Sequence, residues 1–313
     1  MAAPERSTAR PIDAVALAQV RRRLQRAPQA PWLHGEVARR MAERLPVILR
    51  QPRTVLDWGA FLGAGGALLQ RAYPQARVLA VEPDAARRAA GARGIRGAAS
   101  AVPGPAPARP WWSLRLRGRA APQSPVEIGD GQGELLWANM ALHAVADPLA
   151  LMREWHRVLA VDGFLMFSTL GPGSLQALSA LYAAQGWPAP YAPFVDMHDL
   201  GDMLVEAGFA DPVMDQETVT LTWASGMALL AELRALGGNV DPRRAPGLRT
   251  PRWRQRLAAL CDGLAGADGR VALQFEIVYG HAFRPLPRPR LAAETAVPLA
   301  DLRTMARGGR RHA

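Results

Sequence analysis

The sequence contains no lysine, so its 38 basic residues are all arginine, and with 27 acidic residues the net charge is +11. Arginine can be selected for its bidentate grip on phosphate and carboxylate, or a coding bias can replace lysine throughout a chain. We favour coding bias, so the positions of the arginines matter more than their number. Residues 85–119 hold eight arginines and no acid, and residues 284–313 hold seven arginines and two acids. The rest of the chain is close to neutral.

Cysteine is nearly absent, because Cys261 stands alone. This excludes an internal disulfide and a cysteine-rich metal site, and it agrees with a reducing compartment. No His/Cys set has zinc spacing, so we expect no metal. No apolar run reaches the roughly 18 residues of a membrane span, and residues 1–11 lack the apolar stretch of a signal peptide. We therefore expect a soluble, cytoplasmic protein with no membrane contact.

The high arginine content raises nucleic-acid binding as a possible function. Such binding needs arginines gathered on one face together with aromatic side chains for stacking. Trp111 and Trp112, among the arginines of residues 109–119, are the only group of this kind in the sequence. We therefore do not favour a nucleic-acid partner.

The chain is long enough for one large domain or two modest ones, with 313 residues of which 49% are apolar. Apolar residues recur at helical spacing in residues 12–24 and 33–45, which predicts an N-terminal helical cap. Short apolar runs at residues 55–58 and 77–82 flank a helical pattern at residues 64–73. Strand, helix and strand within about 30 residues make a βαβ unit with parallel pairing.

The same alternation returns in the second half of the chain. Apolar runs at residues 134–139 and 164–169 flank a predicted helix. Asp147 and Pro148 are expected to start this helix, and Gly163 is expected to end it. Two strictly alternating strands, around residues 219–223 and 273–279, are predicted to end the fold. The predicted boundaries are a helical cap at 1–50, a main domain at 51–283 and a disordered basic tail at 284–313. Within the main domain we expect a basic insertion at 91–133, a cap insertion at 171–195 and a helical insertion at 224–270.

A glycine-containing turn follows the first predicted strand, from Asp57 to Gly63. Glycines let a ligand approach the backbone, and ligands of open α/β sheets lie at the carboxyl ends of the strands. Glu82 ends the next strand, where a carboxylate can accept two hydrogen bonds from ribose hydroxyls. The alternative is a tight strand-to-helix connection beside an unrelated surface glutamate. The ordered strands that come next lead us to favour a site for a nucleotide-type cofactor.

Another group of polar residues consists of Asp196, His198 and Asp199. These residues could form a metal or acid/base site, or they could be the start of a helix capped by Asp196. We favour the capped helix, with one apolar face over residues 200–207 and an end at Gly208.

The order of four motifs resembles that of class I S-adenosylmethionine-dependent methyltransferases: VLDWGAFLG, RVLAVEP, LLWANMALHAVADP and RVLAVDGFLMFST. Further motifs narrow the resemblance to the biotin-pathway malonyl-[acyl-carrier protein] O-methyltransferases: FSTLGPGSLQAL, FVDMHDLGDMLVEAGFADPVMDQETVTLTW, LLAELRALGGN and FEIVYGHAF. A related mitochondrial complex I assembly factor shares the pattern. The resemblance covers residues 33–283 and implies a Rossmann-like α/β fold with a mostly parallel seven-stranded sheet, an antiparallel last strand and a helical cap.

The resemblance also implies site residues. Asp57, Gly59 and Gly63 take the glycine-loop positions of the family, with Phe61 where the family usually has glycine. Residues 91–133 replace the third strand and the acidic motif that contacts adenine in the family. The implied cofactor-binding set is Asp57, Gly59, Phe61, Gly63, Glu82, Asn139 and Met140, and His143 is the candidate catalytic residue.

The function that the resemblance implies is methyl transfer from S-adenosyl-L-methionine to the free malonyl carboxylate on an acyl carrier protein. A carboxylate is already ionised near pH 7, so positioning and removal of water suffice and no general base is needed. Arg153, Arg157 and Arg234 are each possible ligands of that carboxylate. Two alternatives stay open: another enzyme of this fold, acting on a different acid or resembling a hydroxylase, and a non-catalytic assembly or binding protein, which Phe61 would favour.

Overall fold

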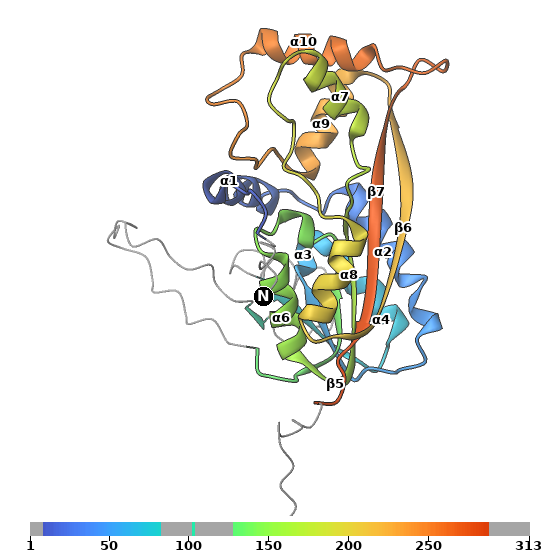
Figure 1. The fold of residues 1–313 in the computed structure, drawn as a ribbon. Coiled ribbons are helices and arrows are strands. Elements are labelled where there is room, and N and C mark those ends of the chain that lie inside the picture. Colours follow the sequence, from blue (N-terminus) through green and yellow to red (C-terminus); the bar gives the residue numbers. More distant parts are fainter. Residues whose placement is uncertain (1–8, 83–101, 104–127, 288–313) are drawn as a thin grey trace, which may run out of the picture.

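The computed structural model describes residues 9–82, 102–103 and 128–287. Most of the predicted basic insertion, including Trp111 and Trp112, and nearly all of the predicted tail lie outside these residues. The described chain forms a seven-stranded sheet of order β3-β2-β1-β4-β5-β7-β6 (Figure 1). The strands are β1 Thr54–Trp58, β2 Arg77–Glu82, β3 Val102–Pro103, β4 Gly133–Ala138, β5 Leu159–Leu170, β6 Ala210–Trp223 and β7 Val271–Phe283.

The direction of the strands confirms the predicted sheet. The expectation that residues 91–133 replace the third strand is wrong, because β3 lies within them and pairs with β2. The β1–β2, β2–β3, β1–β4 and β4–β5 pairs are parallel. Strand β7 runs antiparallel to both of its neighbours, β5 and β6. The carboxyl ends of β1, β2 and β4 therefore meet at one edge of the sheet, where α/β folds hold their ligands.

Helices cover both faces of this sheet because the strands are apolar on both sides. Val55 and Leu135 pack into the core beneath α2 and α4, whereas their neighbours Leu56 and Leu136 pack into the core beneath α6 and α8. Trp155 of α6 is fully buried in the second core. The described helices are α1 Ala14–Gln25, α2 Trp32–Ala42, η1 Leu45–Val47, α3 Ala60–Gly63, α4 Gly66–Ala72, η2 Leu142–Ala144, α6 Pro148–Val158, α7 Gln176–Ala184, α8 Met197–Glu206, α9 Gly226–Leu236 and α10 Pro251–Asp262.

Helix α6 starts as predicted but does not end as predicted. The Asp147 carboxylate accepts a hydrogen bond from Ala150 N at 2.9 Å, and Pro148 occupies the first turn. The prediction that Gly163 closes this helix is wrong, since β5 begins at Leu159 and runs through Gly163. A Cβ at Gly163 would lie 2.8 Å from the Ala160 carbonyl oxygen, so this glycine serves a close backbone approach at the edge of the strand.

Helix α8 confirms the capping interpretation of the Asp196 cluster. The Asp196 carboxylate accepts hydrogen bonds from His198 N at 2.8 Å and from the His198 ring at 2.9 Å. The helix ends before Gly208, whose φ of 99° is in the region that favours glycine. Asp196 and His198 therefore belong to a helix start.

Strands β6 and β7 are longer than the predicted strands and carry most of the helices above the carboxyl edge of the sheet. Helices α7, α9 and α10 gather at one end of this hairpin, and α1 lies across the carboxyl edge of the sheet beside them (Figure 1). Gly171 N donates to the Glu276 carbonyl at 2.9 Å, and Gly173 N donates to the Glu276 carboxylate at 2.9 Å. These bonds fix the segment that leads into α7 against β7. We define the cap as α1, α7, α9, α10 and residues 185–195 and 237–250.

Candidate active site

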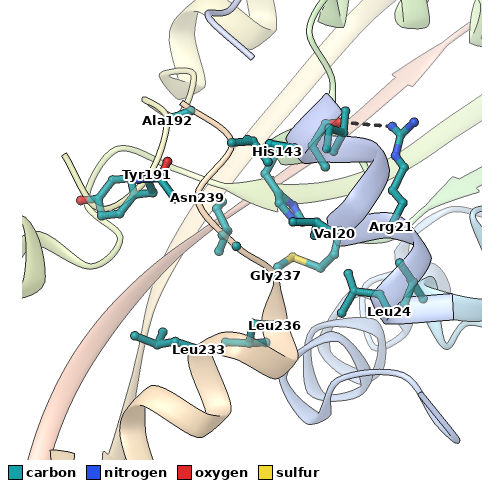
Figure 2. Close-up of a pocket in the computed structure, with 18 of the residues that line it drawn as sticks. Val20, Arg21, Leu24, His143, Tyr191, Ala192, Leu233, Leu236, Gly237 and Asn239 are labelled. Carbon is teal, nitrogen blue, oxygen red and sulfur yellow. Dashed lines mark hydrogen bonds between the residues drawn. The ribbon is translucent and has the colours of Figure 1, made fainter. Parts of the chain in front are cut away.

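A cavity of about 840 Å³ lies between the carboxyl edge of the sheet and the cap. Its floor includes Trp58 and Gly59 after β1, Val81 of β2, and Asn139 and Met140 after β4. Its walls come from α1, α9 and the cap loops, as Figure 2 shows for one part of the cavity. Ligand sites of drug-sized molecules measure roughly 300–1,000 Å³, so this cavity has room for a cofactor together with part of a second substrate.

The glycine turn forms the short helix α3 between β1 and α4. Gly59 precedes this helix with a φ of 72°, a conformation that side-chain-bearing residues rarely adopt. Gly59 and Leu62 line the cavity, whereas Phe61 is half-buried and is not one of the lining residues. Gly63 faces Asn139, whose carbonyl oxygen would lie 3.5 Å from an added Cβ. The Phe61 side chain is thus not part of the described lining of the cavity.

Two buried carboxylates stand behind the turn. Glu82 accepts a hydrogen bond from Phe61 N at 2.5 Å, so the acid at the end of β2 holds the turn through its backbone. Asp57 is completely buried, and neither of its carboxylate oxygens has a hydrogen-bond partner in the described structure. Burial, together with the nearby Glu82 carboxylate, raises the pKa of Asp57 to about 8. Asp57 is therefore largely protonated at neutral pH.

Asn139 joins three parts of the chain at the floor of the cavity. Its side-chain nitrogen donates to the Gly63 carbonyl at 2.7 Å and to the His34 carbonyl at 2.8 Å. Its side-chain oxygen accepts from Ser168 Oγ at 2.7 Å, and Ser168 Oγ in turn accepts from Met140 N at 3.0 Å. The glycine turn, the start of α2, β4 and β5 are tied together by these bonds. Met140 comes next in the chain with a φ of 51°, a conformation that few residues other than glycine adopt.

His34 and Ser168 belong to this arrangement, although the sequence did not single them out. The His34 ring Nδ1 lies 2.9 Å from the Leu62 carbonyl, which connects α2 to the glycine turn through a second contact. His34 is buried at the floor of the cavity. A histidine near the start of α2 and a serine inside an apolar strand are weak signals, because their partners lie far away in the chain.

His143 lies in η2 and lines the cavity. Its ring meets that of His34 edge to face, with the ring centroids 5.9 Å apart. Burial, followed by the effects of His34 and Arg10, lowers the pKa of His143 to about 3. Its Nδ1 is buried without a hydrogen-bond partner in the described structure. The imidazole is therefore neutral across the physiological pH range.

The charged residues that line the cavity are all basic within the described part of the chain. No aspartate or glutamate is among the lining residues. Arg10 is mostly buried, and it donates to the Pro193 carbonyl at 2.6 Å and to the His143 carbonyl at 2.8 Å. Burial lowers its pKa to about 10, which leaves it charged at neutral pH. The arginines that line the cavity are Arg10, Arg21, Arg23, Arg234, Arg244 and Arg249.

The structure separates the three arginines that the sequence left as possible carboxylate ligands. Arg153 pairs with Glu206 at 2.9 Å, and Arg157 pairs with Glu154 at 2.7 Å, and neither lines the cavity. Arg234, at the end of α9, does line it.

Aromatic side chains from the cap close the upper part of the cavity. Tyr182, Tyr191 and Phe194 are lining residues, and the rings of Tyr191 and Phe194 stack 5.2 Å apart. The Tyr191 hydroxyl donates to the Ser174 carbonyl at 3.0 Å. Trp187 packs against Tyr182 from behind, with the ring centroids 5.3 Å apart. These rings give the upper part of the cavity an aromatic wall.

The described residues offer neither a metal site nor a membrane span. None of their His, Cys, Asp and Glu side chains form a group of three or more that could hold a metal ion. Within the same part of the chain, no helix has the length and apolar character needed to cross a bilayer.

The fold defined by these strands, with a glycine turn after β1, an acid at the end of β2 and an antiparallel β7, is that of class I methyltransferases. Residues 30–211 match the methyltransferase domain family. The YcgJ protein of Bacillus subtilis shares the fold, with a TM-score of 0.50 at 12% identity over 80% of this chain and 99% of that one.

Sequence relatives narrow this class. The malonyl-[acyl-carrier protein] O-methyltransferase of Laribacter hongkongensis is 38% identical over 84% of this chain and 86% of its own. The enzyme of the same name from Halorhodospira halophila is 37% identical over 87% of this chain and 88% of its own. The chain therefore belongs to the malonyl-[acyl-carrier protein] O-methyltransferase family, whose cofactor is S-adenosyl-L-methionine.

Proposed function

We propose that this protein transfers a methyl group from S-adenosyl-L-methionine to the free carboxylate of malonyl-acyl-carrier protein, an early step of biotin synthesis. The observation that carries the proposal is the cavity, which leads from the cofactor edge of the sheet into a chamber with six arginines and no acid among its described lining residues. Such a chamber favours an anionic acceptor.

The residues at the floor of the cavity fit the proposed cofactor. When bound, S-adenosyl-L-methionine supplies a methyl group on a sulfonium sulfur, which a carboxylate oxygen can accept in a single displacement. Gly59 leaves open space beside the turn, since an added Cβ would meet nothing within 4 Å. Glu82 is a fully buried carboxylate at the strand end where ribose is expected. A cationic ligand above Glu82 and Asp57 would favour the ionised form of both carboxyl groups.

The acceptor needs no proton removed, because a malonyl carboxylate is already ionised at pH 7. What the chain must supply is orientation and exclusion of water. The aromatic rings of Tyr182, Tyr191 and Phe194 shield the space, and the arginines offset the cost of moving an anion into it. His143 stays neutral, with a pKa of about 3, so we assign it a role in lining the site rather than in proton transfer.

Among the three arginines named from the sequence, we favour Arg234 as a ligand of the substrate carboxylate. It lines the cavity, and no carboxylate of the described residues lies within ion-pair distance of it. We further propose a cytoplasmic location, because the free thiol of Cys261 fits a reducing compartment.

The test is methyl transfer from labelled S-adenosyl-L-methionine to malonyl-acyl-carrier protein, with free malonate and the malonyl-free carrier as competing acceptors. We expect turnover with the malonyl-carrier alone. Turnover with another acid only would favour a different enzyme of the same fold, and no binding of the cofactor would favour a non-catalytic protein.

Glu82→Ala is the matched variant for the cofactor site, and Glu206→Ala is its control. Glu206 is an exposed acid that pairs with Arg153, away from the cavity. We expect Glu82→Ala to weaken cofactor binding by at least about tenfold, the effect of roughly one lost charged hydrogen bond. The control variant should bind the cofactor as the wild type does. Equal binding by both variants would remove Glu82 from the site.

A further inference from the structure

Two arginine-bearing segments of the cap form one continuous surface at the mouth of the cavity. Asp13 N donates to the Val240 carbonyl at 2.8 Å, and Asp13 pairs with Arg244 at 2.8 Å. Ala16 of α1 and Val240 are buried in the same small core. Residues 237–249, which connect α9 to α10, therefore pack on α1. The connection runs beside α1 in Figure 1, and α1 and Gly237 face the same space in Figure 2.

This surface has an excess of exposed positive charge. Helix α1 carries three successive arginines, Arg21, Arg22 and Arg23, and no acid. Arg26 lies at its C-terminus, and Arg249 lies at the edge of the cavity. Arg22, Arg26 and Arg249 are exposed, and the described residues place no carboxylate within ion-pair distance of them. We call Arg22, Arg26 and Arg249 the arginine rim.

Arginines elsewhere in the described structure differ in their neighbours, and several of them are neutralised by acids. On α2, Arg39 and Arg40 both pair with Glu36, at 2.8 and 2.7 Å. On α6, Arg157 pairs with Glu154 at 2.7 Å. Arg71 and Arg77 have no carboxylate of the described residues within ion-pair distance and lie away from the cavity. The rim is therefore distinguished by its place beside a cavity whose described lining residues include no acid.

The positive charge continues from the rim into the cavity. Arg21 and Arg23, next to Arg22 in the sequence, line the cavity, and so does Arg234. Arg23 donates to the carbonyls of Arg234, at 3.1 Å, and of Gly237. A ligand that enters here passes from exposed arginines to half-buried ones without meeting an acid among the described lining residues.

We propose that the arginine rim docks the acidic surface of the acyl carrier protein and the phosphodiester of its pantetheine arm, which then enters the cavity past Arg21 and Arg23. This inference rests on the proposed function. Both anions lie at the base of such an arm, so a single basic surface at the mouth of the cavity can receive them. Complementary charge mainly raises the rate of encounter and weakens as salt rises.

The test compares two double variants with the same change of net charge. Arg26→Glu/Arg249→Glu reverses the rim, and Arg71→Glu/Arg77→Glu reverses two exposed arginines at the end of α4 and the start of β2, which do not line the cavity. Each protein is assayed with malonyl-acyl-carrier protein and with malonyl-pantetheine, which has neither carrier nor phosphate. Circular dichroism and the melting temperature verify that each variant is folded.

We expect the rim variant to lose at least about tenfold in kcat/KM for the malonyl-carrier, with a loss at least about fivefold smaller for malonyl-pantetheine. The difference should shrink between about 50 and about 300 mM salt. The control variant should change kcat/KM for the carrier by less than about twofold. Equal losses on the two substrates, or an equal loss in the control variant, would overturn the docking surface.

A direct binding assay keeps this inference separate from the proposed function. Fluorescence anisotropy measures binding of the phosphopantetheine-bearing carrier without a malonyl group, and the rim variant should bind it at least about tenfold more weakly than the wild type. If the wild type binds this carrier but methylates no malonyl-carrier, the proposed function fails and the docking surface stands. If the rim variant binds the carrier as well as the wild type, the docking surface fails whatever the activity. Tighter binding of an unrelated oligonucleotide than of the carrier would also overturn it.

Discussion

The two ends of the cavity are built in opposite ways. At the floor, polar side chains satisfy one another: Asn139 uses its amide on Gly63, His34 and Ser168. At the mouth, Arg244 pairs with Asp13, but Arg10 and Arg23 bond to main-chain carbonyls and the arginine rim lies exposed. None of the described lining residues is acidic. The floor is therefore rigid and close to neutral before any ligand binds, whereas the mouth has positive charge that only a partner can neutralise. This difference suggests that the floor orients the cofactor and the mouth selects the acceptor.

The largest expected effect comes from breaking the floor with Asn139→Ala. This change removes three hydrogen bonds of a buried side chain and leaves the Gly63 and His34 carbonyls without their donor. The free energy of unfolding should fall by about 2–4 kcal/mol, and cofactor affinity should fall with it. Chemical denaturation and equilibrium binding measure both.

Ser168→Ala is the graded control for this prediction, because it removes fewer of the same bonds. It should lower the free energy of unfolding by about 1–2 kcal/mol. A larger loss for Ser168→Ala than for Asn139→Ala would show that Asn139 is not the centre of the floor.

The second prediction breaks the mouth with Arg10→Met. Arg10 holds residue Pro193 of the cap and the carbonyl of His143, so its loss should loosen the cap. We expect KM for the malonyl-carrier to rise about tenfold, with cofactor affinity changing less than about threefold. Steady-state kinetics and direct cofactor binding separate the two effects, and an equal loss of both would contradict the division between floor and mouth.

The third prediction concerns the buried carboxyl group beneath the floor. Burial raises the pKa of Asp57 to about 8, so in the ligand-free folded state it stays protonated over a pH range in which the unfolded chain ionises it. A raised pKa means that folding stability is lost as pH rises from about 4 to about 8. Asp57→Asn cannot ionise in either state, so its free energy of unfolding should exceed that of the wild type at pH 7 and nearly equal it at pH 4, with a difference that grows as pH rises.

Denaturation of the wild type and of Asp57→Asn across this pH range provides the measurement. The same variant should bind the cofactor more weakly, because it cannot ionise to place a negative charge below a cationic ligand. A stability difference that does not vary with pH would show that Asp57 is ionised in the folded protein.

The smallest effect is expected from Phe61→Gly, which restores the residue usual in the family. Phe61 is not among the lining residues, and its backbone N–H bonds to Glu82 whatever the side chain. Cofactor affinity should change by less than about threefold, with about 1 kcal/mol lost in stability from glycine in a short helix. Equilibrium binding of the cofactor is the measurement. A gain of tenfold or more in cofactor affinity would show that the phenylalanine obstructs the site.

Local sequence signals predicted most of the elements around the site. The apolar runs of β1, β2 and β4 and the caps Asp147 and Asp196 depend on residues close together in the chain, and the structure has them as predicted. Gly163 shows the limit of such signals. A glycine after a helix is typical of a helix end, but here the strand begins earlier and the glycine permits contact with a neighbouring strand.

The candidate site was predicted unevenly for the same reason. Of the residues predicted to bind the cofactor, Gly59, Asn139 and Met140 line the cavity, whereas Asp57, Phe61, Gly63 and Glu82 are not among its lining residues. His34 and the role of Arg10 were missed, because their partners at Leu62 and Pro193 are distant in sequence. The sequence also could not choose among three arginines, because the ion pair of Arg153 joins α6 to α8 and only the folded chain shows that neither Arg153 nor Arg157 lines the cavity.

The sequence by itself determined the order of strands and helices, the glycine turn with its acid after β2, and the family to which the chain belongs. These features result from hydrophobic periodicity and from short motifs, which act over a few residues. Only the tertiary structure decided which side chains face the cavity, which carboxyl group is buried and protonated, and which arginines lack an acidic neighbour. Those properties depend on burial and on contacts across the whole chain, and both arise only when the cap packs over the carboxyl edge of the sheet.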